Sequence, residues 1–364
     1  MTELVESRFE TLHEIVKAAR TQLNQNIWDY LVGATETETT LRRNRLALDS
    51  IAFRPRVLRD VSSIDCTHRF LGKPLRIPVA LAPVGSLESF EAGGGATVAA
   101  AAAEFGSPFF LSSVTHPGLE AAAAQAGEAC KIFQLYVRGD DAFVDDYARR
   151  AVDAGYDAFC ITVDTALYSR RERDLSKRFV KYWRQRATGH DYQAALSWKD
   201  VERFKAKHKI PLILKGIATE EDARIALEHG VDGIYVSNHG GRQLDHGRGA
   251  MEVLPEVLAV ARGKALILVD GGFSRGTDIV KAIAMGADLV AIGRLYCYGL
   301  AAAGAPGIVR VLELLESEIR TCLGLLGVDR LSALDKSYLA PAAPVSTPGV
   351  HGAFPLLDLE SGIY

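Results

Sequence analysis

Residues 265–270 read ALILVD, a strand-length apolar run, and runs of this kind occur eight times between residues 78 and 294. The other seven runs are PVALAP (78–83), PFFLSS (108–113), KIFQLY (131–136), AFCITVD (158–164), PLILKG (211–216), GIYVSN (233–238) and LVAIGR (289–294). Each run is too continuously apolar for a half-exposed strand. The pattern therefore predicts eight buried parallel strands.

Helical stretches separate these runs. Four of them are ATVAAAAAEFG (96–106), DDAFVDDYARRAVDAG (140–155), TEEDARIALEHG (219–230) and GTDIVKAIAMGA (276–287). Several end at or next to glycine, the usual residue after the last turn of a helix. Eight strand–helix units over about 220 residues predict an α/β fold of the (β/α)₈, or TIM barrel, type. A doubly wound open sheet is the alternative. It is disfavoured because the count is eight and no G-x-G-x-x-G run follows the first strand.

The segment before the barrel reads as helical. Apolar positions from Val5 to Leu23 are spaced three and four apart, and the run NIWDYLVGA follows them. That spacing is typical of amphipathic helices. We therefore expect a helical N-terminal extension over residues 1–50, packed on the main body.

The segment after the last predicted strand has two parts. Residues 308–326 place their apolar side chains on one helical face, which predicts a C-terminal helix. Residues 335–364 are proline-rich and irregular, and we expect an arm that packs on its own or a neighbouring subunit, or a loose tail. With the barrel at about 78–325, the chain is expected to form a single domain over residues 1–364.

Composition excludes several classes of protein. The 364 residues are 48% hydrophobic and 24% charged, with a net charge of −3, which is ordinary for a soluble protein and argues against nucleic-acid binding. Five cysteines without a C-x-x-C pair argue against a disulfide framework or a metal site. The acidic start MTELVESRF is no signal peptide, and apolar stretches are interrupted before they could span a membrane. We expect a cytoplasmic protein.

Polar residues gather where the predicted strands end, which is where barrel enzymes carry their chemistry. Three pairs lie two positions apart, and so on one side of the sheet: Gln134 and Tyr136, Thr162 and Asp164, Ser237 and His239. The second and third pairs come from the fourth and sixth strands, and alternate strands fill the same layer of a barrel. Asp164 and His239 are therefore expected to meet in the mouth of the barrel.

The ends of the last two strands suggest a phosphate site. Asp270, Gly271 and Gly272 are followed by Ser-Arg-Gly at 274–276, and Gly293 by Arg294. Glycines allow close backbone approach, and an arginine beside a helix start holds a dianion. Barrels commonly bind phosphate at this place. We therefore expect a phosphorylated substrate or cofactor.

One connection is longer than the others. Residues 166–198, between the fourth and fifth strands, are polar and basic. A long loop at this end of a barrel is usually part of the active site or a lid over it, and a disordered surface insertion is the alternative.

Three charged residues suggest roles without settling them. His239 is a natural base near neutral pH, and the Arg242 guanidinium can clamp a carboxylate. Lys215, at the end of the fifth strand, suits either a Schiff-base lysine or a fixed positive charge beside a cofactor.

The run SNHGGRQLD at 237–245, with TVDTALYSRRERD at 162–174, resembles the FMN-dependent L-2-hydroxy-acid oxidases and dehydrogenases, which include glycolate oxidase, lactate oxidase and mandelate dehydrogenase. SNHGGRQLD is highly specific, and weaker pieces follow in the family's order. These are WDY (28–30), TL-x-x-NR (40–45), FRPRVL (53–58), LAP (81–83), QLY (134–136), LSWKD (196–200), LKG (214–216), DGG (270–272) and IGR (292–294). The resemblance covers nearly the whole chain.

The resemblance implies FMN as cofactor and oxidation of an L-2-hydroxy acid to the 2-oxo acid. His239 would be the base, oriented by Asp164. Substrate ligands would be Arg171, Arg242, Tyr136, Tyr30 and the wall residue Val114. Lys215 would lie beside the flavin ring. Further cofactor ligands would be Pro83, Val84, Gly85, Ser112, Gln134, Thr162, Ser237, Asp270 and Gly271, with Gly272, Arg275, Gly293 and Arg294 at the phosphate.

Two departures from the family pattern bear on substrate and acceptor. Val114 stands where glycolate-type members carry tryptophan, so we expect a longer aliphatic or aromatic acid to be preferred to glycolate. Gly85 stands where strict oxidases often have alanine, so we expect oxygen to be used while other acceptors compete well. The family also implies a homotetramer or octamer.

Three other functions compete with this interpretation. Another FMN barrel enzyme, such as an isomerase, would keep the flavin but has less use for two arginines beside a base. A Schiff-base aldolase built on Lys215 would lack flavin. A catalytically idle barrel used as a binding module would not need the His239–Asp164 pair.

Overall fold

The structure is a computed structural model that describes residues 9–179, 188–345 and 347–357. Its centre is a closed barrel of eight parallel strands in the order β10-β11-β4-β5-β6-β7-β8-β9. The strands are β4 (Val79–Leu81), β5 (Phe109–Ser112), β6 (Lys131–Leu135), β7 (Ala158–Thr162), β8 (Leu212–Ile217), β9 (Gly233–Val236), β10 (Leu266–Val269) and β11 (Leu289–Ile292). All eight predicted runs form these strands, so the predicted (β/α)₈ barrel is confirmed.

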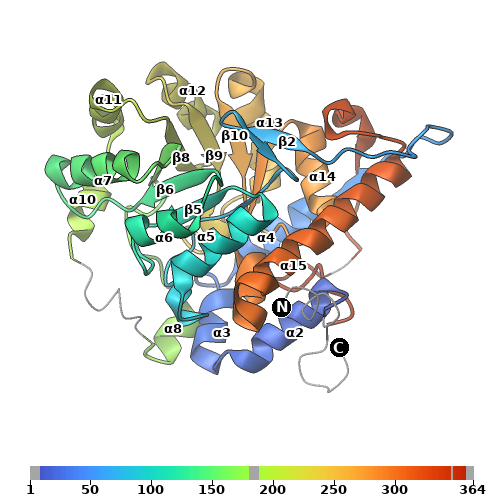
Figure 1. The fold of residues 1–364 in the computed structure, drawn as a ribbon, viewed down its shortest axis with the longest axis horizontal. Coiled ribbons are helices and arrows are strands. Elements are labelled where there is room, and N and C mark those ends of the chain that lie inside the picture. Colours follow the sequence, from blue (N-terminus) through green and yellow to red (C-terminus); the bar gives the residue numbers. More distant parts are fainter. Residues whose placement is uncertain (1–8, 180–187, 346, 358–364) are drawn as a thin grey trace.

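Helices surround the barrel (Figure 1). Those that follow strands are α5 (Gly94–Phe105), α6 (Leu119–Gln125), α7 (Asp141–Asp153), α11 (Trp198–Lys207), α12 (Glu220–Glu228), α13 (Ala250–Ala261), α14 (Gly276–Met285) and α15 (Arg294–Leu326). Short helices α8 (Glu172–Ser176) and α10 (His190–Ala195) lie in the long connection after β7. Single-turn 3₁₀ helices are η1 (Leu87–Ser89), η2 (His239–Gly241), η3 (Leu331–Ala333) and η4 (Lys336–Tyr338).

Two apolar clusters hold the fold together. The larger lies between the strands and the surrounding helices. The smaller fills the inside of the barrel with every second strand residue, including Phe110, Ile132, Cys160, Tyr235 and Leu268. Because side chains alternate along a strand, the next inward positions are the polar residues at the mouth. The same alternation that builds the core therefore aims the site residues inward.

The N-terminal extension contains α2 (Leu12–Gln22), α3 (Gln25–Val32) and α4 (Thr39–Asp49). Thr11 caps the N-terminus of helix α2, and its side chain forms a capping box with Glu14. The part of the predicted first helix before residue 9 lies outside the described residues. Helix α3 leads directly to the barrel mouth, which makes the extension part of the site.

Four short strands complete the fold. Strands β2 (His68–Phe70) and β3 (Lys73–Leu75) form a hairpin at the end where the barrel strands begin, with Lys73 paired to Asp157. Strand β1 (Ile51–Phe53) pairs antiparallel with β12 (Leu339–Pro341). This pairing fixes the start of the C-terminal arm on its own subunit.

Helix α15 is longer than predicted. It begins at Arg294 immediately after β11 and contains a break at Ala303 and Gly304. By length and composition alone it could cross a membrane, but 72% of its apolar 18-residue stretch is buried inside the protein. It packs against α2 and α5, as the core helix of a globular protein does (Figure 1).

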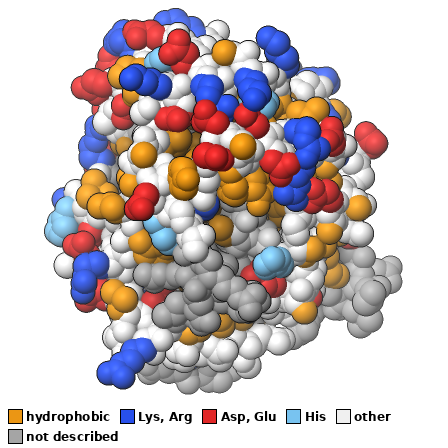
Figure 2. All heavy atoms as spheres, turned by 90° about the vertical axis from the view of Figure 1, so that its left-hand side faces the viewer, with side chains coloured by type: hydrophobic (Ala, Val, Ile, Leu, Met, Phe, Trp, Pro, Cys, Tyr) orange, Lys and Arg blue, Asp and Glu red, His pale blue; other side chains and the backbone are white. Residues whose placement is uncertain are grey.

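On the face of the molecule drawn in Figure 2, basic and acidic side chains are interspersed. Ion pairs join α11 to its neighbours, for example Arg203 with Asp145 and Lys205 with Asp232. These side chains are half-buried at the protein surface, where an ion pair contributes only about 0–1 kcal/mol. The barrel and its apolar clusters, and not these pairs, account for the stability of the fold.

Candidate active site

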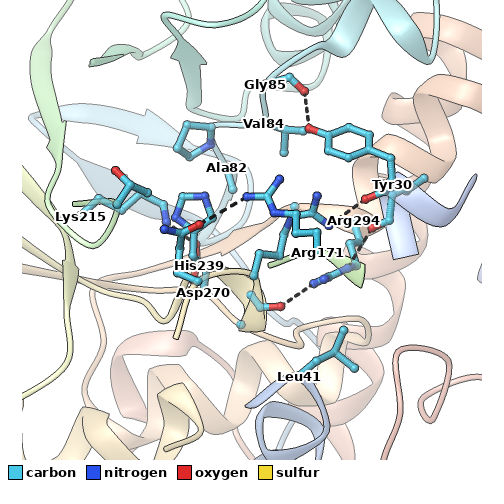
Figure 3. Close-up of a pocket in the computed structure, with 18 of the residues that line it drawn as sticks. Tyr30, Leu41, Ala82, Val84, Gly85, Arg171, Lys215, His239, Asp270 and Arg294 are labelled. Atoms are coloured by element: carbon cyan, nitrogen blue, oxygen red, sulfur yellow. Dashed lines mark hydrogen bonds and ion pairs between the residues drawn. The ribbon is translucent and has the colours of Figure 1, made fainter. Parts of the chain in front are cut away.

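A cavity of about 370 Å³ opens at the end of the barrel where the strands finish (Figure 3). Its lining comes from the loops after the strands, from α3 and α4, and from the start of α15. Of the predicted site residues, it is lined by Tyr30, Pro83, Val84, Gly85, Val114, Tyr136, Arg171, Lys215, His239, Arg242, Asp270, Gly271, Gly272, Gly293 and Arg294. The structure therefore brings most of the predicted residues together.

His239 lies at the centre of a hydrogen-bonded chain. Its Nδ1 is 3.0 Å from Oδ1 of Asp164, and its Nε2 is 3.3 Å from the Tyr136 hydroxyl. The residue has a φ of +59°, a left-handed conformation that is rare outside glycine. The side chain of Asn238 accepts from the backbone N–H of Gly241 and supports this turn. Strained backbone of this kind is concentrated at functional sites.

The surroundings of His239 favour the neutral form of its ring. Burial lowers the pKa of His239 below its ordinary value, and Lys215 and Arg171 add to that effect against the opposing pull of Asp164. Burial works to raise the pKa of Asp164, but the neighbouring His239 and Lys215 outweigh it and hold the pKa below its ordinary value. A neutral imidazole backed by a carboxylate can accept a proton at neutral pH.

Two arginines beside His239 have no acidic partner among the described residues. Arg171 contacts Gln243 at 3.5 Å, and its buried Nε has no hydrogen-bond partner. Arg242 donates from Nη1 to the carbonyls of Tyr30 and Gly33, and its buried Nη2 is also without a partner. Burial and the charge of Arg171 hold the pKa of Arg242 well below its ordinary value. This arrangement fits an anionic ligand.

Lys215 lies on the floor of the cavity, beside Asp270 (Figure 3). Its Nζ donates to Oγ of Ser237 at 2.8 Å and is 3.3 Å from the Asp270 carboxylate. Burial works to lower the pKa of Lys215, but Asp270 and Asp164 outweigh it and raise the pKa. A Schiff-base lysine needs a lowered pKa to be nucleophilic. The environment of Lys215 therefore favours a fixed cation.

Buried polar atoms on neighbouring strands fit a cofactor. Both side-chain polar atoms of Gln134 and the hydroxyl of Thr162 are buried without a hydrogen-bond partner. Buried polar groups are normally paired, so these atoms indicate a ligand. Gly271 and Gly272 have φ of +105° and +86°, and a Cβ on Gly271 would come within 2.9 Å of Asn44. The residues present thus fit a flavin nucleotide that needs close backbone approach.

Ser112 and Ser237 do not line the cavity directly but support residues that do. Ser112 Oγ accepts from the backbone N–H of Val114 at 3.4 Å. Ser237 Oγ accepts from Lys215 and from the backbone N–H of His239, and donates to Asp270.

Arg275 is a predicted phosphate ligand that does not line the cavity. Its guanidinium pairs with Glu318 of α15, with Nη2 at 2.5 Å from Oε1. Ser274, one position earlier, lines the cavity instead. Arg294 does line it, donates to the carbonyls of Leu31, Gly33 and Gly240, and has no ion pair with a described carboxylate. Of the two arginines, only Arg294 is therefore placed to meet an anion in the cavity.

Several lining residues were not predicted as site residues. Helix α4 contributes Leu41, Asn44 and Arg45, and the C-terminal arm contributes Gly349 and Val350. The TL-x-x-NR run was a signal for the first group, whereas the arm carries no motif. The rest of the wall includes Phe90, Arg138, Ala166, Leu167, Tyr168, His190, Asp191 and Ala194. The described ends of the long connection after β7 are thus part of the cavity, as expected.

A sequence profile of the FMN-dependent dehydrogenase family matches residues 19–341. The L-lactate oxidase of Nostoc sp. is 36% identical over 359 residues, covering 90% of this chain and 97% of that protein. The 4-hydroxymandelate oxidase of Amycolatopsis orientalis is 37% identical over 347 residues, covering 89% and 96%. These shares are large enough to show the family.

Solved structures agree. Mandelate oxidase with 3,3-difluoro-2-hydroxy-3-phenylpropionic acid superposes with a TM-score of 0.85 at 38% identity, covering 93% of this chain and 100% of that one. A mandelate oxidase variant with a C4a-OH-FMN adduct gives 0.83 at 38% identity, covering 91% and 99%. The chain is thus a flavin-dependent oxidoreductase of the TIM barrel type. It belongs to the FMN-dependent dehydrogenase family, acts on the CH–OH group of 2-hydroxy acids and uses FMN.

Proposed function

We propose that this enzyme oxidises an L-2-hydroxy acid larger than glycolate to the 2-oxo acid, with His239 as the base. The observation that carries the proposal is the pair Arg171 and Arg242, each of which has one buried nitrogen without a hydrogen-bond partner, beside the His239–Asp164 pair. An arginine fork binds a carboxylate with two parallel hydrogen bonds. A free carboxylate held there places the adjacent hydroxyl next to His239.

FMN, when bound, takes up the hydrogen that leaves the substrate C2 with its electron pair. The side chains of the protein accept the proton of the substrate hydroxyl. Nε2 of His239 accepts the hydroxyl proton as the C–O bond becomes a carbonyl, and Asp164 stabilises the imidazolium that forms. Tyr136 has a raised pKa, caused first by burial and then by Asp164, so its hydroxyl stays a hydrogen-bond donor. Lys215 supplies a fixed positive charge where negative charge develops.

The apolar part of the cavity lining favours an apolar side chain on the substrate. Phe90, Val114, Leu167 and Ala194 are among the residues that line the cavity. Each buried methylene contributes about 0.8 kcal/mol, so two or three more carbons give roughly one to two decades in kcat/KM. Mandelate oxidase and 4-hydroxymandelate oxidase, among the relatives, are named for aromatic hydroxy acids.

Acceptor and assembly belong to the same proposal. Because position 85 is glycine and lines the cavity, oxygen is used while dyes or protein acceptors compete. The protein works as a homotetramer in the cytoplasm. Oxygen uptake compared with dye reduction at equal substrate tests the first statement, and sedimentation of the holoenzyme tests the second.

The test is anaerobic bleaching of the bound flavin with a panel of L- and D-2-hydroxy acids of increasing side-chain length. Rapid bleaching by the L-acids only, faster for larger side chains than for glycolate, supports the proposal. Bleaching by D-acids, or none by any acid with FMN bound, contradicts it. The variant His239→Gln is the matched control, because it keeps the cavity and removes the base.

A further inference from the structure

Lys215 belongs to a buried network that the oxidation step does not explain. Its ammonium group, the Ser237 hydroxyl and the Asp270 carboxylate are joined by contacts of 2.8, 2.6 and 3.3 Å. The side chains of Lys215 and Asp270 are 4% and 11% exposed. Ser237 also accepts from the backbone N–H of His239 at 3.0 Å. One hydroxyl therefore links the cation on the cavity floor to the turn that carries the base.

A fixed cation beside a reducible group favours the reduced form, because reduction adds negative charge. A carboxylate 3.3 Å from that cation opposes its field. Lys215 and Asp270 both line the cavity, so a cofactor held there experiences both charges. The protein thus presents a cation together with a carboxylate that moderates it.

We propose that Asp270 is a positioning residue that sets both the charge and the place of the Lys215 ammonium group, with Ser237 as the bridge, and thereby sets the reduction potential of the bound FMN. In this role Asp270 has two opposite effects. It weakens the positive field at the cofactor, and it keeps Lys215 protonated in a buried site. Which effect dominates depends on pH.

The groups that face Lys215 decide this dependence. They are Asp270 after β10, Cys160 of β7, Asp164 after β7, Tyr235 of β9 and His239 after β9. Burial works to lower the pKa of Lys215, and Asp270 is the largest of the charges that raise it. Without Asp270 the pKa of Lys215 is lower, so we expect any loss of the cation to begin at the alkaline end of the pH range.

The test is the FMN midpoint potential of the holoenzyme, measured against reference dyes from pH 6.5 to 9.5. Near neutral pH, Asp270→Asn is expected to raise the midpoint potential by about 30 mV or more. This corresponds to at least a ten-fold change in the equilibrium constant of two-electron reduction. Towards alkaline pH this difference from wild type is expected to shrink or reverse, as Lys215 loses its proton in the variant first. A difference that stays constant over the whole range, or no difference, overturns the proposal.

Two controls separate charge from structure. Asp270→Glu keeps the carboxylate and is expected to restore the wild-type pH profile. Asp288→Asn removes a carboxylate before β11, at the opposite end of the barrel, where it accepts from the N–H of Ile267, and is expected to leave the potential unchanged. A shift in Asp288→Asn equal to that in Asp270→Asn would show a general effect of destabilisation and would overturn the proposal.

A second pair of variants covers the case in which Asp270→Asn fails to hold FMN. Removing both charges avoids an unpaired buried ion, so Lys215→Met is compared with the double variant Lys215→Met and Asp270→Asn. The double variant is expected to have the higher potential, with a difference that does not change with pH. Equal potentials would overturn the proposal. From the proposed function, this inference needs only that FMN binds in this cavity. No substrate is used, so a wrong substrate assignment leaves the measurement intact.

Discussion

Nδ1 of His239 lies 3.0 Å from Oδ1 of Asp164, although the two residues are 75 positions apart in the chain. Each lies four positions after an inward-facing strand residue, Tyr235 of β9 for His239 and Cys160 of β7 for Asp164. Both side chains therefore continue the inward-facing row of their strand. The contact gives the ring one partner for Nδ1 and leaves Nε2 toward the cavity and Tyr136.

His239→Gln should retain FMN but reduce it far more slowly. Glutamine can keep hydrogen bonds but cannot take up the substrate proton, and loss of one acid–base group typically costs about 10²–10⁴-fold. Stopped-flow absorbance of the flavin under anaerobic conditions measures the rate. Reduction within ten-fold of wild type would reject His239 as the base.

Asp164→Asn should move the acid limb of the pH profile. Activity requires neutral His239, so kcat/KM falls as pH drops through the pKa of that ring. Asp164 raises this pKa, whereas burial, Lys215 and Arg171 lower it. Removing the carboxylate should therefore shift the acid limb to lower pH, together with a lower plateau. A limb that moves to higher pH would contradict the assigned role of Asp164.

Arg294→Ala should weaken FMN retention, and Arg275→Ala should not. Arg294 lines the cavity without a carboxylate partner, whereas Arg275 is paired with Glu318 outside it. A lost charge-assisted hydrogen bond costs about 1.5–3 kcal/mol, which corresponds to roughly ten- to hundred-fold in FMN affinity. Fluorescence titration of the apoprotein measures this affinity. The opposite ranking of the two variants would move the phosphate site to Arg275.

Arg242→Lys should affect substrate and spare the cofactor. A lysine cannot reproduce the two-point contact of a guanidinium with a carboxylate, so KM should rise and flavin reduction slow by about ten-fold or more. FMN content should remain at the wild-type level. Loss of FMN with an unchanged KM would mean that Arg242 holds the cofactor phosphate.

The site residues that were predicted correctly are positioned by the geometry of a strand, whereas Arg275 is positioned by a loop. Asp164 and His239 were predictable because alternation along a strand is fixed by its geometry. Arg275 was not, because Gly271 and Gly272 take left-handed conformations after β10 and end the alternation. The chain then turns Arg275 toward Glu318 and leaves Ser274 at the cavity.

Long-range packing explains the other unpredicted lining residues. Asn44 of α4 reaches the cavity because its amide exchanges hydrogen bonds with the side chain of Asn238. Val350 reaches it because His351 stacks on Trp28 at 5.6 Å and Phe354 lies edge-on to His13. No local periodicity encodes contacts between segments so far apart, whereas each barrel strand carries its own apolar signature.

Val114→Trp should reverse the preference for larger acids. A Cβ placed on Gly85 would come within 2.8 Å of Cγ2 of Val114, so the valine already fills the space against the loop after β4. A larger side chain at position 114 must therefore extend into the cavity, whose apolar lining includes Phe90 and Leu167. The variant should lose roughly one to two decades in kcat/KM for acids with two or three extra carbons, and little for glycolate.

Val152→Trp, on the exposed side of α7, is the matched control for the added bulk. The measurement is kcat/KM across a series of L-2-hydroxy acids. If wild type already prefers glycolate, another wall residue such as Tyr168 fills the space, and Val114 does not set the size of the substrate.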